Sequence, residues 1–339
     1  MDSSSSSSTA QQAIEDCFGV LKLYSDGSIS RTSHKEHQVK THDDGSAIWK
    51  DCCFDSNNNL QQRVYKPKNH YYSSSNKNEY RKNLPVVYYL HAGGFCFTSR
   101  NAHNTCLSLC SGLQALIICP YYRLAPEDRL PAALEDAVTA LKFLQAQALR
   151  ESREVDHEKW LFDIGGVDVD RVFIFGDSSG GNIAHHLAIQ LGSGSLELSP
   201  IRVRGYILLS PFFGGVFRTK SEEESPKEDF WSQEIYDQFW RLAMPNGADR
   251  DHPLVNPFGP KSPSLEGLSL DPFLVLVGGD EILKDRVEDY AKRMKSLNNN
   301  VKYVEFKGKQ HGFFTSYPYF GESQNVVQIV KNFMSESSN

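Results

Sequence analysis

A serine between two glycines occupies a position suited to a catalytic nucleophile. The residues Gly176, Asp177, Ser178, Ser179 and Gly180 match the pattern Gly-x-Ser-x-Gly and lie between an apolar run and a helical pattern. In a strand–turn–helix unit, such glycines permit a sharp turn that lifts the serine hydroxyl above the edge of the sheet. The pattern predicts that Ser178 is a nucleophile and that the Ser179 N–H stabilises an oxyanion. A glycine-rich turn or a phosphate cradle is the alternative, although no lysine follows as in a phosphate-binding loop.

A second glycine-rich stretch is suited to stabilising negative charge. Residues 91–95 have the sequence HAGGF and follow an apolar run directly. A glycine-rich backbone can point two N–H groups at a developing negative charge, which makes Gly93 and Gly94 candidate oxyanion donors. A tight turn without a catalytic role is the alternative for this stretch.

A serine nucleophile needs a base, and the base needs an acidic partner. His311 follows the apparent strand 301–306, in the order serine, acid, histidine that one class of serine hydrolases uses. The acid should follow the apolar run 271–279. Asp280, Glu281 and Asp285 are all available there, and the residues alone do not choose among them. Asp285 is also suited to cap the following helix.

Strand and helix patterns that could position these residues alternate along the chain. Continuous apolar runs are typical of parallel strands that are buried on both faces, and five such runs occupy residues 85–91, 115–120, 169–176, 203–210 and 271–279. Amphipathic helical patterns occupy residues 131–147, 178–192, 286–297 and 323–334. This alternation predicts an α/β fold with a doubly wound, mostly parallel sheet. The stretch 212–268 does not alternate and is expected to be an insertion over the strand ends.

Composition limits the classes of protein and partner. Hydrophobic residues make up 40% of the 339 residues, enough for a sizeable core. The net charge of −6, without a long basic run, argues against a nucleic-acid partner. No apolar run approaches the roughly 20 residues of a membrane span. Residues 1–12 are serine-rich and are expected to be disordered, followed by one domain over residues 13–339.

The expected location is the cytosol. The seven cysteines include no C-x-x-C pair, and the N-terminal segment lacks the features of a secretory signal. These features favour a reducing compartment with free thiols. A nuclear location stays open, and the oligomeric state is not predicted.

Several stretches together resemble a known family. The sequences HAGGF, YRLAPE, LPAALEDA, GDSSGGN, GGDEILKDR and QHGFF are similar to those of plant carboxylesterases of the hormone-sensitive-lipase group of α/β hydrolases. The resemblance extends from about residue 14 over nearly the whole chain, and is strongest to the carboxylesterases that cleave strigolactones. It implies an α/β-hydrolase fold with helical cap elements at about 13–31 and 212–268. It also implies that Glu281 is the acid, and that no metal or cofactor is used.

The resemblance further implies hydrolysis of a small apolar ester or lactone, such as a strigolactone-type hormone or a related metabolite. Ser178 would attack, His311 would act as base, and Glu281 would orient the histidine. Seven side chains are candidates for an apolar pocket wall, although a core position is the favoured alternative for each one: Phe95, Phe97, Phe212, Phe213, Trp240, Ile282 and Phe313.

Two other functions stay open, the first because of a departure from the family and the second because receptors share this fold. The family usually has glycine where this chain has Ala92, and a positive φ there would strain an alanine. The first alternative is a lyase or cyclase of plant specialised metabolism on the same scaffold. The second is a hormone receptor without catalysis, although such receptors replace the histidine that this chain keeps as His311.

Overall fold

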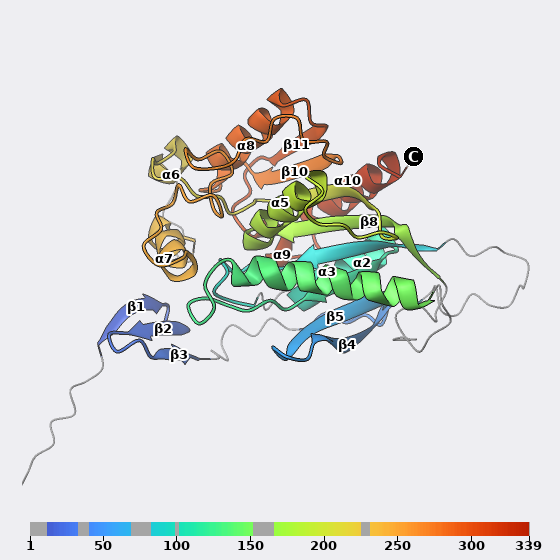
Figure 1. Cartoon of the computed structure of the whole chain (residues 1–339), viewed down its shortest axis with the longest axis horizontal. Helices are drawn as coiled ribbons and strands as arrows, with labels where there is room; N and C mark the ends of the chain where they lie inside the picture. The colour runs from blue at the N-terminus through green and yellow to red at the C-terminus, as the bar shows by residue number, and fades with distance from the viewer. Residues whose placement is uncertain are drawn as a thin grey trace, which may run out of the picture.

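The computed structural model describes most of the chain, and the structural statements below refer to residues 12–32, 41–68, 83–98, 102–151, 166–224 and 231–338. The serine-rich tail predicted for residues 1–12 lies outside these ranges except for its last residue. An eight-stranded sheet forms the centre of the molecule, with the strand order β11-β10-β9-β8-β6-β7-β5-β4 (Figure 1).

The predicted parallel strands are confirmed. The strands of the sheet are β4 (Ala47–Asp55), β5 (Leu60–Pro67), β6 (Leu84–Leu90), β7 (Leu116–Pro120), β8 (Val167–Asp177), β9 (Val203–Leu209), β10 (Phe273–Gly278) and β11 (Val301–Phe306). Strands β6 to β11 run parallel, whereas β5 is antiparallel to both β7 and β4. Every residue of β6, β7 and β10 is buried, which explains why their sequences are continuously apolar.

Helices cover both faces of the sheet, as the alternating pattern predicted. They are α2 (Ala102–Leu113), α3 (Ala132–Glu151), α5 (Ser179–Gly192), α6 (Lys220–Glu224), α7 (Gln233–Ala243), α8 (Lys284–Ser296), α9 (Phe313–Ser316) and α10 (Glu322–Glu336). Helices α3, α5 and α8 contribute to one hydrophobic cluster, and α2 and α10 contribute to a second cluster across the sheet (Figure 1). No helix in the described ranges is both long and apolar enough to cross a membrane.

The N-terminal segment differs from the prediction of a helical cap. Residues 13–31 form a separate antiparallel sheet of β1 (Ala13–Cys17), β2 (Leu21–Tyr24) and β3 (Ile29–Arg31), which is called the N-terminal sheet below. Two turns prevent a helix. Phe18 and Gly19 have φ values of 53° and 68°, and Gly27 has a φ of 81° beside an Asp26 carboxylate that accepts the Ser28 N–H.

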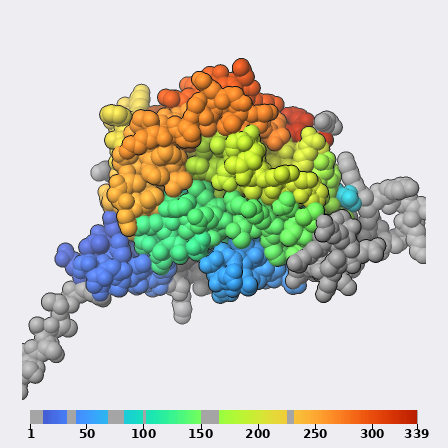
Figure 2. Space-filling model, viewed as in Figure 1, coloured from blue at the N-terminus to red at the C-terminus, as the bar shows by residue number. Residues whose placement is uncertain are grey.

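The stretch 212–268 contains the aromatic-rich helix α7, as predicted, together with the short helix α6. The N-terminal sheet contacts α7, because the Glu15 carboxylate forms an ion pair with Arg241. In addition, Gln238 Nε2 donates to the Asp16 carbonyl at 3.4 Å. In Figure 2 the blue surface of the N-terminal sheet lies directly against the orange surface around α7.

Candidate active site

The predicted nucleophile occupies a sharp turn between β8 and α5. Ser178 has φ 53° and ψ −113°, a conformation that costs a non-glycine residue on the order of 1–3 kcal/mol. The flanking glycines let the helix approach the sheet. A β-carbon at Gly176 would lie 2.1 Å from the Gly180 carbonyl oxygen, and one at Gly180 would lie 2.0 Å from the Leu90 carbonyl oxygen. Both glycines of the Gly-x-Ser-x-Gly pattern are therefore required by packing.

The structure brings His311 to this serine. Nε2 of His311 lies 3.1 Å from Oγ of Ser178, within hydrogen-bonding distance. The histidine follows β11 and immediately precedes Gly312, the left-handed N-cap residue of α9. Both side chains are buried. A serine and a histidine so arranged can transfer a proton from the hydroxyl to the imidazole.

Among the three candidate acids, only Glu281 reaches the histidine. Its Oε1 lies 3.6 Å from His311 Nδ1, and its Oε2 accepts hydrogen bonds from Ser210 Oγ at 2.8 Å and from the Gly278 N–H at 3.1 Å. Asp280 is exposed. The Asp285 carboxylate accepts the N–H of Ser221, and Leu283 rather than Asp285 occupies the cap position of α8. The geometry supports the assignment of Glu281.

The candidate oxyanion donors are free to bind a ligand. Within the described residues, the N–H groups of Gly93, Gly94 and Ser179 donate to no protein atom. Gly93 and Gly94 have φ values of 134° and 60°, which favour glycine, whereas Ala92 has no positive φ. The alanine that departs from the family pattern is thus not strained.

His91 is a site residue that the sequence analysis did not identify. Its Nδ1–H donates to the Ala92 carbonyl at 2.8 Å, on the peptide group that supplies the Gly93 N–H. Burial lowers the pKa of His91 to about 4, so the ring is neutral near pH 7. The ring stacks on Tyr122 with centroids 4.2 Å apart, and the Tyr122 hydroxyl donates to the His91 carbonyl at 2.8 Å. These contacts fix the loop that carries the glycines.

Helix α7 and the segment just before it place aromatic rings around the site, and most of these were also not predicted. The rings of Trp231 and Tyr236 lie edge-on to His311, with centroids 5.1 Å and 5.6 Å away. Phe239 lies against Gly94. The predicted pocket residues Phe212 and Trp240 stack at 3.8 Å. The surroundings of the site are therefore mostly aromatic.

The remaining pocket candidates divide into two groups. Phe95 packs near Phe212 and Trp240, Phe97 packs against Phe239, and Ile282 is buried next to Glu281 in sequence. Two others lie elsewhere. Phe213 packs against Tyr290 of α8 at 4.6 Å, and Phe313 packs against Phe306 in the cluster on the other face of the sheet. The structure does not bring Phe213 and Phe313 to the rings around His311, because each is held by a core contact.

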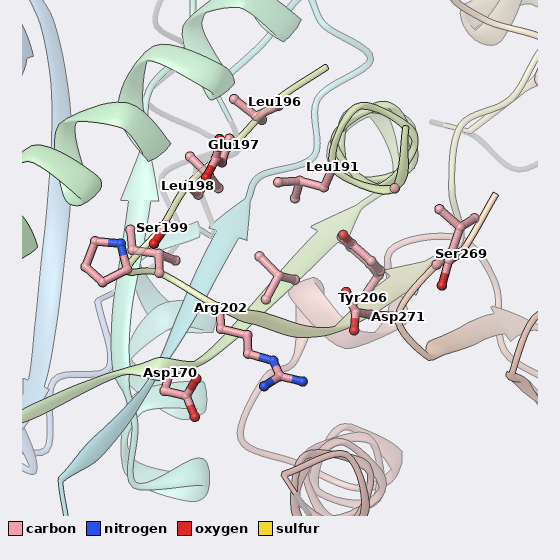
Figure 3. A pocket seen from close by; sticks show the side chains of 15 residues that line it. Asp170, Leu191, Leu196, Glu197, Leu198, Ser199, Arg202, Tyr206, Ser269 and Asp271 are labelled. Carbon is pink, nitrogen blue, oxygen red and sulfur yellow. The ribbon is translucent and has the colours of Figure 1, made fainter. Parts of the chain in front are cut away.

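A separate pocket lies at the amino ends of the strands, opposite the end that carries the catalytic candidates. Its volume is about 440 Å³, and it is bordered by the amino ends of β8 and β9 and by the segment before β10 (Figure 3). Asp170, Arg202 and Asp271 contribute charged groups to its lining, and it includes none of the catalytic candidates. Within the described ranges, no three His, Cys, Asp or Glu side chains are grouped as metal ligands would be.

Comparisons with known proteins agree with this geometry. Residues 87–315 match a family model described as "alpha/beta hydrolase fold". The chain is 32% identical to probable carboxylesterase 8 of Arabidopsis thaliana, over 94% of this chain and 92% of that protein. It is 35% identical to the gibberellin receptor GID1C of Arabidopsis thaliana, over 78% of this chain and 74% of that protein.

The fold also matches a solved enzyme structure. An esterase of Pyrobaculum calidifontis superposes with a TM-score of 0.68 at 26% identity, covering 88% of this chain and 86% of that one. The family match, the near full-length relative and the central sheet are mutually consistent. The chain therefore belongs to the plant group of carboxylesterase-type α/β hydrolases that also includes the gibberellin receptors.

Proposed function

We propose that the protein is a serine carboxylesterase that hydrolyses a small apolar ester or lactone without a cofactor. The observation that carries this proposal is the 3.1 Å contact between His311 Nε2 and Ser178 Oγ. A histidine within hydrogen-bonding distance of a serine hydroxyl is the arrangement that activates the hydroxyl as a nucleophile. The fold and the carboxylesterase relatives support the same reaction.

Each side chain has a role in this proposal. Ser178 Oγ attacks the carbonyl carbon while His311 Nε2 takes the hydroxyl proton, and Glu281 stabilises the resulting imidazolium. The carbonyl oxygen becomes an oxyanion that accepts the N–H groups of Gly93, Gly94 and Ser179. When the carbon–oxygen bond to the leaving group breaks, His311 returns the proton to the departing alcohol. In the second half of the reaction, His311 takes a proton from a water molecule, and the water oxygen attacks the acyl carbon. The bond to Ser178 Oγ then breaks, and His311 returns the proton to the serine.

The aromatic surroundings favour an apolar substrate. Trp231 and Tyr236 beside His311, and Phe239 beside Gly94, would contact the parts of an ester nearest the reacting carbonyl. Aromatic rings recognise apolar and ring-shaped groups by burial and stacking. A strigolactone-type hormone or a related metabolite is the specific substrate we propose, because such a molecule combines an apolar ring system with a lactone ester.

A cytosolic location accompanies this proposal. No disulfide joins the seven cysteines, which all lie within the described ranges, and most of them are buried. Cysteines without disulfides suit a reducing compartment.

The test is a product assay with the purified protein. Wild type and Ser178→Ala are each incubated with p-nitrophenyl acetate and with a synthetic strigolactone, and the products are identified by absorbance and mass spectrometry. Wild type should release p-nitrophenol and cleave the lactone. Loss of the nucleophile should lower kcat by a factor on the order of 10⁶.

The same assay separates the alternatives. Loss of water from a substrate without ester cleavage would favour a lyase. Tight binding of a hormone without any turnover would favour a receptor. Retention of a tenth of the wild-type rate in Ser178→Ala would exclude Ser178 as the nucleophile.

A further inference from the structure

A guanidinium group from the N-terminal sheet reaches the loop that holds the candidate oxyanion glycines. Arg31, the last residue of β3, donates from Nη1 to the Cys96 carbonyl at 2.6 Å and from Nη2 to the Ala125 carbonyl at 2.7 Å. Its Nε and Nη2 also bind the two carboxylate oxygens of Glu127, at 2.7 Å and 2.6 Å. A single side chain thus joins the N-terminal sheet to two segments of the hydrolase core.

The carbonyl of Cys96 is connected to Gly94 through two peptide groups. The peptide group that contains this carbonyl also contains the Phe97 N–H, which donates to the Gly93 carbonyl at 2.9 Å. The Gly93 carbonyl, in turn, shares its peptide group with the Gly94 N–H. That N–H donates to no protein atom in the described part of the chain and is a proposed oxyanion donor.

The direction of these hydrogen bonds matters for their effect. A cation that donates to a carbonyl withdraws electron density from it, which makes the N–H of the same peptide group a stronger donor. The effect passes from the Cys96–Phe97 peptide to the Gly93–Gly94 peptide, because each donates to the next. The positive end of the first peptide dipole therefore points at the Gly93 carbonyl, and the positive end of the second is the Gly94 N–H itself.

The loop also needs support from outside. Phe95, between the glycines and Cys96, has a φ of 63°, which is unfavourable for a residue with a bulky side chain. The Ala125 N–H donates to the Phe95 carbonyl at 2.9 Å, and Arg31 binds the neighbouring Cys96 carbonyl and the Ala125 carbonyl. Arg31 thus braces the loop against the same segment that supports Phe95.

We propose that Arg31 is a positioning residue for ester hydrolysis, a role that rests on the proposed function. It holds and polarises the Gly94 N–H, so the N-terminal sheet contributes to stabilising the transition state of every ester. A sheet that only contacted large substrates would not affect a small ester such as p-nitrophenyl acetate. The two roles therefore predict different kinetics.

Arg241 provides a matched control. It joins the same N-terminal sheet to α7 through Glu15, and its side chain also binds Glu234, but it forms no hydrogen bond or ion pair with residues 91–98. Replacing Arg241 by glutamine weakens the attachment of the sheet and leaves the hydrogen bonds of Arg31 in place.

The kinetic test uses Arg31→Gln, Arg31→Lys and Arg241→Gln in the full chain. Arg31→Gln should lower kcat for p-nitrophenyl acetate roughly 10- to 100-fold with little change in KM, because a displaced oxyanion donor weakens only transition-state binding. Arg31→Lys should be intermediate, since one ammonium group keeps the charge but cannot bind both carbonyls. Arg241→Gln should keep kcat within about twofold, as expected for an ion pair outside the site.

Two outcomes would overturn the proposal. One is an equal loss of kcat in Arg31→Gln and Arg241→Gln, and the other is a kcat within about twofold of wild type in Arg31→Gln.

A second measurement does not depend on turnover. Amide hydrogen exchange at Cys96 and Phe97 should be faster in Arg31→Gln than in wild type and unchanged in Arg241→Gln. If wild type hydrolyses no ester while Arg31→Gln shows faster exchange, the proposed function fails, but Arg31 still supports the loop. Unchanged exchange in a folded Arg31→Gln would show that Arg31 does not support the loop. If Arg31→Gln does not fold, Arg31→Lys is subject to the same two criteria.

Discussion

The side chain of Phe239 occupies the space beside Gly94 so closely that a β-carbon at the glycine would lie 2.3 Å from Phe239 Cδ2. Helix α7 thus packs directly on a proposed oxyanion donor. Gly94 also has a φ of 60°, which is unfavourable for other residues. Absence of a side chain at position 94 is required both by the neighbouring ring and by the backbone.

Gly94→Ala should therefore lower kcat, and the loss should exceed the loss caused by an alanine at a positive φ alone. The methyl group must displace either the loop or Phe239, and loss of one oxyanion donor lowers kcat by roughly 10²- to 10³-fold. Gly194→Ala is the control, because Gly194 has a similar φ of 74° and a β-carbon there would meet no atom within 4 Å. Comparable kcat values for the two variants in p-nitrophenyl acetate hydrolysis would contradict the prediction.

The assignment of the acid can be tested by comparing neighbours. Glu281→Gln should lower kcat by roughly 10³- to 10⁴-fold, because the imidazolium loses its charged partner. Asp280→Asn should have a small effect, since Asp280 is exposed, and Asp285→Asn should alter the contact with Ser221 instead of the site. Steady-state kinetics of the three variants decides the matter. A greater loss in Asp280→Asn than in Glu281→Gln would reassign the acid.

Ala92→Gly should leave acetate hydrolysis within a few-fold of wild type. Ala92 has no positive φ, so replacement by glycine relieves no strain, and the Gly93 and Gly94 donors are already present. The measurement is kcat for acetate and for esters with larger acyl groups, which the smaller residue should accept better. A weak wild-type activity that rises tenfold in the variant, about 1.4 kcal/mol of transition-state stabilisation, would instead favour the lyase or cyclase function.

Asp177 makes stability depend on pH. Burial raises the pKa of its carboxyl from 3.8 to about 7, with Glu281 adding to the increase while His311 opposes it. The folded state thus holds a proton that the unfolded state releases above about pH 4. The stabilisation is complete below that pH and is lost as the pH rises through about 7.

Asp177→Asn removes this titration. The melting temperature of the variant relative to wild type should increase between about pH 4 and pH 8, because only wild type loses stability at Asp177 in that window. Scanning calorimetry at a series of pH values measures the difference. A difference that stays constant with pH would show that Asp177 does not titrate as described.

Local patterns made much of the fold and the nucleophile predictable. Continuous apolar runs indicate doubly buried strands, and the glycines around Ser178 are spaced as the packing of α5 requires. By contrast, the N-terminal segment was expected to be helical from family resemblance. Its turns at Phe18–Gly19 and Asp26–Gly27 determine a β-sheet instead. Gly19 and the Asp26–Gly27 pair are residue types that favour turns, so the signal is present in the sequence.

The contacts that complete the site could not be predicted locally. Asp280 and Glu281 are adjacent in sequence, and only the three-dimensional path of the loop buries one carboxylate beside His311 and exposes the other. Phe239 and Gly94, likewise, are far apart in the chain and meet only because the insertion folds back over the strand ends. Side-chain type gave no indication of these pairings.

Cys17 can serve as an internal reporter of how often the N-terminal sheet separates from α7. Its thiol is completely buried and lies 3.5 Å from the amide oxygen of Gln238, across the contact between the two elements. A thiol-specific reagent can reach it only when they part, and burial also raises its pKa to about 12, which slows reaction further. Cys53 is exposed and would be labelled first. The delay before Cys17 reacts therefore becomes longer as the open form becomes rarer, and a ligand that holds the sheet closed would lengthen that delay.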